Sequence, residues 1–295
     1  MRAASTVLAI AGRNLRLYAR DPLNVFFSLL GALIVFLLYA LFLGGLQTDS
    51  IADSVPGADE ASVRGFVDSW MFAGVVTLTT VTTPLGALST FVEDGATGRF
   101  RDFLVSPIRR GQLVLGYLLA AFAIGVVMSL IVLAIAAAYL WAFSGVVLSV
   151  GALLRSVGWI VLSAAAFAAL WSFVISFVRT TGAFAALSTI IGTVSGFVAG
   201  AYIAVGLFPD AVRNAVSALP FAQSAMLLRR ELTAATVSDL VGGSDEAAAQ
   251  LDAFYGITLS VGDWEVPVGA AAGILAGIAV LFALLAAARI RRRIR

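Results

Sequence analysis

Residues Leu23–Leu46 read LNVFFSLLGALIVFLLYALFLGGL and contain no charged side chain. A helix needs about 20 mostly apolar residues to cross a bilayer, and this run is long enough. In the chain as a whole, 61% of the 295 residues are apolar, 12% are charged, and the mean hydropathy is +1.01. Soluble domains carry about 25% charged residues. The sequence therefore predicts an all-α integral membrane protein with several spans.

Further apolar runs follow the first one. Gly111–Val178 holds one charge, Arg155, in 68 residues, which is too long for a single span, and Ser144-Gly145 and Gly151 offer a break. Arg155 falls near one end of its span, where it either snorkels to the interface or contacts a gate or substrate. We expect one transmembrane domain over residues 1–295, with spans at residues 23–46, 70–92, 112–143, 151–178, 181–208 and 266–288.

The arginines indicate the orientation. With six spans both termini share one side, which holds 14 arginines and four acids, against five arginines and 13 acids on the other. By the positive-inside rule, both termini are expected in the cytoplasm and the protein in the plasma (inner) membrane. Arg13, Arg16 and Arg20 follow a short apolar stretch, so we expect an N-terminal amphipathic helix at the membrane surface. Anionic lipids are the expected partners of these charges, and nucleic acid is not.

Several residue types are absent. The chain has no cysteine and no histidine, and all 19 cations are arginine. No disulfide, His–metal site or Walker lysine can form, so we expect no cofactor, no metal, no catalytic residue and no ATPase site. None of the expected spans carries an Asp or Glu. An ion-coupled carrier needs an ionisable group at depth, and this absence argues against one.

Two spans carry hydroxyl side chains. Those of the second are Thr77, Thr80 and Thr83 at helical spacing, and those of the fifth are Ser188, Thr189 and Thr193. Such hydroxyls either bond to their own helix backbone and join helices, or line a path for an amphiphilic substrate. Glycines spaced by four in the fifth and sixth spans favour close helix packing, within one chain or between two.

The most informative segment is FVEDGATGRFRDFLVSPIRRG, residues 91–111. Phe100, Phe103 and Leu104 lie at i, i+3 and i+4, so a short helix would present an apolar stripe until Pro107 stops it. That stripe needs a cover of lipid or partner protein.

Here the chain resembles the permeases of ABC type-2 (ABC-2 family) transporters. The resemblance rests on two sets of residues. The first is Glu93, Gly98, Leu104, Ser106-Pro107, Arg109 and Leu113, and the second is Gly200, Gly206, Pro209, Leu219-Pro220 and Leu228-Arg229.

The resemblance implies a membrane permease subunit of an ABC exporter. Such permeases form homo- or heterodimers and bind two copies of a separate ATPase. It also implies a coupling helix at about residues 97–107 that docks on the ATPase, with Glu93, Gly98, Phe100, Phe103, Leu104 and Pro107 as its residues. The second and fifth spans would flank the exit path. Residues 233–267 form a longer outer insert than the family leads us to expect, and the resemblance assigns it no role.

After the fifth span, residues 210–231 are too charged to span and too apolar for water, and Leu219-Pro220 breaks the middle. We expect two short re-entrant helices that cap the outer end of the path, with their arginines at the headgroup level. The alternative is an amphipathic helix lying flat on the surface. The outer gate residues would be Phe208, Pro209, Leu219, Pro220 and Phe221.

The expected function is outward movement of a drug-like molecule, lipid, glycolipid or peptide, powered by partner ATPases. A secondary, ion-coupled multidrug or lipid carrier is the main alternative. A membrane enzyme predicts clustered acids or histidine, which the expected spans lack. A non-transport scaffold predicts no polar path, and the Thr and Ser faces speak weakly against it.

Overall fold

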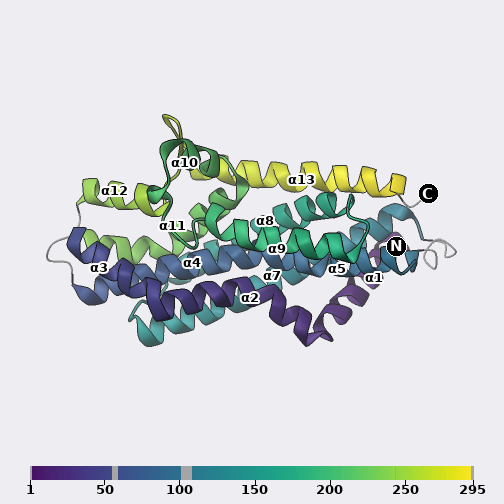
Figure 1. The fold of residues 1–295 in the computed structure, drawn as a ribbon, viewed down its shortest axis with the longest axis horizontal. Coiled ribbons are helices and arrows are strands. Elements are labelled where there is room, and N and C mark those ends of the chain that lie inside the picture. Colours follow the sequence, from purple (N-terminus) through teal and green to yellow (C-terminus); the bar gives the residue numbers. More distant parts are fainter. Residues whose placement is uncertain (1, 55–58, 101–107, 243, 294–295) are drawn as a thin grey trace.

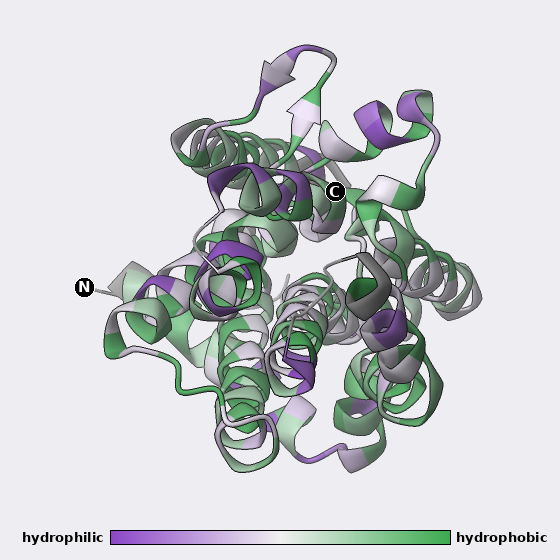
Figure 2. Ribbon diagram, turned by 90° about the vertical axis from the view of Figure 1, so that its left-hand side faces the viewer, coloured by the Kyte–Doolittle hydropathy of each residue, from purple (hydrophilic) through white to green (hydrophobic). Residues whose placement is uncertain are grey.

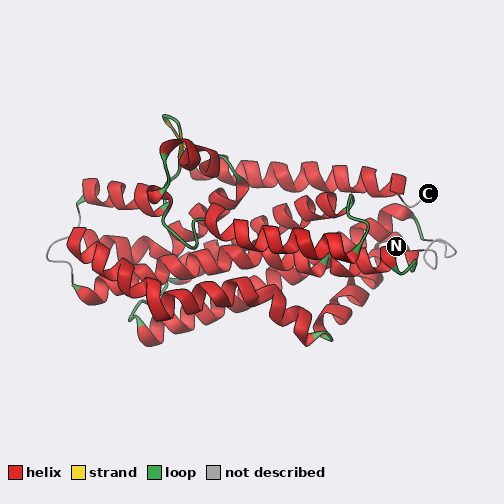
Figure 3. Cartoon of the chain, in the orientation of Figure 1, coloured by secondary structure: helices red, strands yellow, loops and turns green. Residues whose placement is uncertain are grey.

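The protein is described here by a computed structural model that covers residues 2–54, 59–100, 108–242 and 244–293. Nearly all of this part is helical, as Figure 3 shows. Six of its helices are long and apolar enough to cross a membrane, which confirms the all-α membrane fold. They are Pro22–Ile51, Glu60–Ala96, Gly111–Phe143, Val150–Ile175, Thr181–Val198 and Val268–Arg289.

The first two helices meet at a sharp bend, visible in Figure 1. Asp21 caps the second helix by accepting a hydrogen bond from the backbone N–H of Asn24 at 3.0 Å, and Pro22 starts it with a preset φ. The first span then continues through one π-helical turn. These elements are α1 (Arg2–Ala19), α2 (Pro22–Leu38), the turn η1 (Tyr39–Leu43) and α3 (Gly44–Ser54).

The second span lies at the centre of the bundle and is buried almost throughout. It begins at Glu60, ahead of the expected residue 70, because the helix continues through a charged turn that hydropathy alone excludes. Pro84 lies inside it and cannot donate to the helix ladder. Gly125 faces Pro84, and a Cβ there would lie 2.6 Å from the proline Cγ. The span comprises α4 (Glu60–Ala87) and α5 (Ser89–Ala96).

The third and fourth spans form the expected hairpin around α4. The break falls at Ser144-Gly145, where Gly145 takes a φ of +67° that favours glycine, and Ser149 caps the helix that follows. The last span lies along the fourth, as Figure 1 shows. These helices are α7 (Arg110–Phe143), α8 (Val150–Ile175) and α13 (Val268–Arg293).

The fifth span, α9 (Thr181–Val198), ends at Val198 and not at the expected Phe208. Gly200 has a φ of +64°, and the N–H of Ala201 bonds back to the Gly196 carbonyl at 2.7 Å. This is the usual way in which a glycine ends a helix. The apolar residues that follow are therefore not helical, and only a 3₁₀ turn, η2 (Val205–Leu207), remains of them.

The long insert folds at one end of the bundle, which we call the insert end; the opposite end, with both termini, is the terminal end (Figure 1). Seen from the insert end, hydrophilic residues gather in its short helices and hairpin, and apolar residues cover the long helices (Figure 2). The insert end contains α10 (Asp210–Ser217), α11 (Pro220–Val241), α12 (Asp245–Tyr255), and the antiparallel strands β1 (Ser260–Val261) and β2 (Trp264–Glu265).

Candidate functional site

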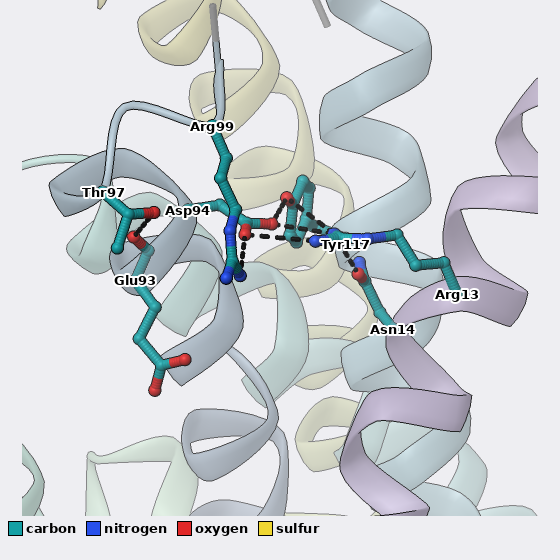
Figure 4. A network of polar contacts seen from close by, with 7 residues as sticks. All are labelled: Arg13, Asn14, Glu93, Asp94, Thr97, Arg99 and Tyr117. Atoms are coloured by element: carbon teal, nitrogen blue, oxygen red, sulfur yellow. Dashed lines mark hydrogen bonds and ion pairs between the residues drawn. The ribbon is translucent and has the colours of Figure 1, made fainter. Parts of the chain in front are cut away.

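A buried carboxylate organises the terminal end of the bundle. Asp94 of α5 is 0% exposed, yet hydrogen bonds reach it from three sides (Figure 4). Arg13 of α1 donates from both terminal nitrogens, at 2.8 and 3.1 Å. The hydroxyl of Tyr117, on α7, donates a short bond to the same carboxylate. Arg99 donates at 3.3 Å. The expectation that no span carries an acid is therefore wrong, because the second span extends to Ala96 and includes Asp94.

The ion pair fixes α1 against the bundle. The bond from Asp94 is the main cause that raises the pKa of Arg13 above its ordinary value, and a two-fold guanidinium–carboxylate pair is a strong, directional contact. Ile10 on the same helix is buried and packs where α7 has Gly116; a Cβ at Gly116 would lie 2.5 Å from the Ile10 side chain. The N-terminal helix is thus held by one buried charge contact and by close apolar packing along α7.

The third donor begins the segment expected to contact an ATPase. Gly98 turns the chain after α5 with a φ of +77°, which favours glycine. Arg99 then reaches back to Asp94, with its own side chain 56% exposed. Phe100 folds onto Phe91, with ring centroids 5.1 Å apart. Phe100 is thus half-buried within its own chain.

The other expected coupling residues have different positions. Glu93 is exposed, and its backbone carbonyl accepts a bond from Thr97 Oγ1 at 2.8 Å. Phe103, Leu104 and Pro107 lie outside the described residues.

The hydroxyls expected to line a path differ between the two spans. Thr77, Thr80 and Thr83 on α4 are all 0% exposed. Thr77 and Thr80 donate to carbonyls of their own helix at 2.8 and 2.7 Å, and Thr83 Oγ1 has no partner among the described residues.

On α9 the expected hydroxyls divide, because Ser188 Oγ is buried without a partner among the described residues. Ser188 is half-buried and Thr189 and Thr193 are exposed. Thr189 and Thr193 each bond to their own backbone at 3.0 Å. No cavity among those described contains both sets.

The expected gate residues lie on separate parts of the insert end. The chain does break before Pro220, between α10 and α11. Leu219 at this break is 40% exposed, whereas Phe221 turns inward and packs on Phe167 of α8 with centroids 5.2 Å apart. Phe208 is half-buried and Pro209 is exposed.

Arg229, one of the hairpin arginines expected at the headgroup level, lies inside the protein and not on its surface. It is 0% exposed and bonds to the carbonyls of Ala199 and Gly200. Sequence reasoning named Arg229 only as part of a family motif and missed its burial, and it missed the Asp94 cluster. The available signal was that Asp94 and Arg229 each lie beside or within a long apolar stretch, where a charge needs a partner.

A family comparison supports the resemblance drawn from sequence. The family model described as ABC-2 family transporter protein matches residues 45–288, more than half of the chain. A search of curated proteins found no match. The matched region contains the second to fifth spans, most of the sixth, the Asp94 carboxylate and the whole insert. The chain therefore belongs to the ABC-2 family and is a multi-pass membrane permease component of an ABC transporter.

Proposed function

We propose that this permease is an exporter subunit that works with two copies of a separate ATPase and with a second permease copy or homologue. The substrate is an amphiphile such as a drug-like molecule, a lipid, a glycolipid or a peptide. ATP binding and hydrolysis occur on the partner, because this chain has no lysine for a Walker motif. The permease lies in the inner membrane with both termini in the cytoplasm, which agrees with the distribution of its arginines.

One observation carries the proposal: a single buried carboxylate joins three elements that an ATPase would have to move together. Asp94 belongs to the central span, Arg13 to the N-terminal helix and Arg99 to the proposed coupling segment. Burial makes this contact stiff, because a charge in a low-dielectric site keeps its partners or becomes very costly. A displacement of the segment after Gly98 would therefore be transmitted through Asp94 to the central span and to α1 together.

The path is proposed to run between α4 and α9. Thr189 and Thr193 of α9 are exposed on this chain, as are its large apolar side chains Ile190 (60%) and Phe197 (45%). A second copy placed against this face would enclose Thr189 and Thr193 in a shared, neutral polar channel. Neutral hydroxyls suit amphiphiles, since they bond to polar groups without requiring a fixed charge on the substrate.

The decisive experiment is purification in mild detergent followed by reconstitution. A P-loop ATPase should co-purify, and proteoliposomes of the complex should export a fluorescent amphiphile only when ATP is supplied. Export driven by a proton or sodium gradient without ATP would establish the secondary carrier and overturn the proposal.

Variants then test the coupling contact. Asp94→Asn should keep the ATPase bound and lower ATP-driven export more than Asp49→Asn, which alters an exposed acid at the insert end. Phe103→Ser and Leu104→Ser should release the ATPase from a folded permease. Equal export by the two Asp variants would contradict the coupling role of Asp94.

A further inference from the structure

Arg229 is a fully buried cation that has no acidic partner in the described ranges of the chain. Its side chain is 0% exposed, and no ion pair among the described residues includes it. Burial lowers its pKa only to about 10, so the guanidinium stays charged at neutral pH. Burying a charge without a counter-charge costs free energy. Other contacts must therefore stabilise this guanidinium.

The end of the fifth span stabilises part of this charge. Nη2 of Arg229 donates to the carbonyls of Ala199 and Gly200, at 2.8 and 2.7 Å. Ala199 is the C-cap of α9, so these are carbonyls that have no partner within the helix and that carry the negative end of its dipole. The cation therefore closes the end of α9 from the side of α11.

The second span supplies the other contact. The guanidinium carbon lies 5.1 Å from the centre of the Trp70 ring, at a distance where a cation is attracted to an aromatic face. The Trp70 indole N–H is itself held by the Tyr255 carbonyl at 2.8 Å. One side chain on α11 thus bridges α4 and the end of α9, the two spans proposed to flank the path.

The surrounding backbone leaves room for this side chain and for little else. Gly200 and Gly256 both have positive φ values, +64° and +67°. A Cβ at Gly256 would lie 2.8 Å from Nη1 of Arg229, and one at Gly200 would lie 3.1 Å from Nη2. Nε and Nη1 have no acceptor within the part of the chain that the structure describes. Two of its donors are thus left unsatisfied in this closed arrangement, which costs free energy, while the α9 carbonyls and the Trp70 ring hold the guanidinium in place.

We propose that Arg229 is a positioning residue that locks the insert-end seam between α4 and α9, and that this seam opens when its two bonds to the α9 carbonyls are released. The proposal rests on the proposed export path. In this proposal the path is closed by Arg229 bound to the carbonyls at the end of α9. The aromatic pair Phe208 and Phe221 is then not the gate.

Ala201 offers a reporter for the seam. It is 1% exposed and touches α4 where Gly74 has no side chain; a Cβ there would lie 3.0 Å from the Ala201 Cβ. The chain has no native cysteine, so Ala201→Cys is the single target for a polar maleimide. The permease is labelled alone in lipid nanodiscs, with Arg229→Gln, with Arg229→Lys, and with Arg230→Gln as the matched control. Arg230 is the adjacent, exposed arginine.

Arg229→Gln should speed labelling of Cys at position 201 by at least about tenfold over Arg230→Gln, and Arg229→Lys should fall between them. A second reporter, Ala121→Cys on α7, is 0% exposed and should stay protected, which separates seam opening from general loosening. Equal labelling in all backgrounds would overturn the proposal. If Arg229→Gln does not yield a monodisperse protein, the comparison of Arg229→Lys with Arg230→Gln decides it in the same way.

This readout is independent of the ATPase. Should no ATPase co-purify, the proposed function fails while the labelling result stands. Should an ATPase drive export while the seam labels equally in every variant, the lock fails alone.

Discussion

Arg155 of α8 donates from Nε to Glu231 of α11 at 2.7 Å, and the Trp159 indole donates to the other carboxylate oxygen at 3.2 Å. The arginine that the sequence left between a snorkelling role and a gate role is therefore half of an ion pair between two helices. Arg155 keeps its side chain 60% exposed, and Glu231 is largely covered.

This pair should contribute little to stability. Exposed ion pairs are worth about 0–1 kcal/mol, so Arg155→Gln should lower the free energy of unfolding by less than about 1 kcal/mol. Glu231→Ala should cost more than Arg155→Gln, because it also removes the partner of the Trp159 indole. Denaturant titration in detergent, followed by tryptophan fluorescence, measures both. A larger loss for Arg155→Gln would show that the pair matters to the fold.

The contact between Pro84 and Gly125 should be intolerant of any added side chain. Gly125→Ala would force a Cβ to 2.6 Å from the proline ring, and overpacking of this kind costs about 1–3 kcal/mol. Gly158→Ala on α8 is the matched control, since a Cβ there meets nothing within 4 Å and the change removes a glycine from a helix. Thermal unfolding should show a lower Tm for the first and an equal or higher Tm for the second; two equal Tm values would contradict the close approach of α4 and α7.

The acid Asp252 on α12 should give a pH-dependent stability. Burial raises the pKa of this carboxyl, Arg230 lowers it in part, and Oδ1 has no bonding partner among the described residues. The folded state therefore binds the proton more tightly than the unfolded state, and stability rises as the pH falls through the raised pKa towards the ordinary carboxyl pKa. Asp252→Asn should be more stable than the wild type at pH 7, with the difference shrinking as the pH is lowered.

A matched acid checks that result. Asp263 lies in the nearby hairpin and is exposed, so Asp263→Asn should follow the wild-type Tm across the same pH series. If both variants behave alike, the effect belongs to net charge and not to burial.

The proposed path makes a prediction for introduced cysteines. Thr189→Cys and Thr193→Cys on the exposed face of α9 should react with polar thiol reagents during ATP-driven turnover, and Thr77→Cys, Thr80→Cys and Thr83→Cys should become reactive only then, because they are buried at rest. Mass spectrometry of the labelled chain, with and without ATP, measures this. Protection of the α4 positions throughout would assign those threonines to helix packing.

The sequence predicted the features that depend on local pattern. The long apolar runs indicated the six spans, the break at Ser144-Gly145 was visible as a turn, and Pro220 marked the start of a helix. Features that depend on distant partners were out of reach. Asp94 stands 81 residues from Arg13 and 23 from Tyr117, and Arg229 stands 30 residues from Ala199. A charge in an apolar segment looks like a boundary when its partners are unknown, so the sequence places Asp94 in the loop after the second span and Arg229 at the headgroup level.

The central position of α4 has a consequence for how the chain is made. Synthesis delivers this span second, yet the helices that cover it, α7, α8 and α11, leave the ribosome later. Until they arrive, its threonines are exposed to lipid or to the insertion machinery. The hydroxyls of Thr77, Thr79 and Thr82 tolerate lipid at this stage, because each donates to a carbonyl of its own helix four residues back. Thr83 Oγ1 has no such bond to any described residue, so its hydroxyl depends on the later helices to shield it from lipid.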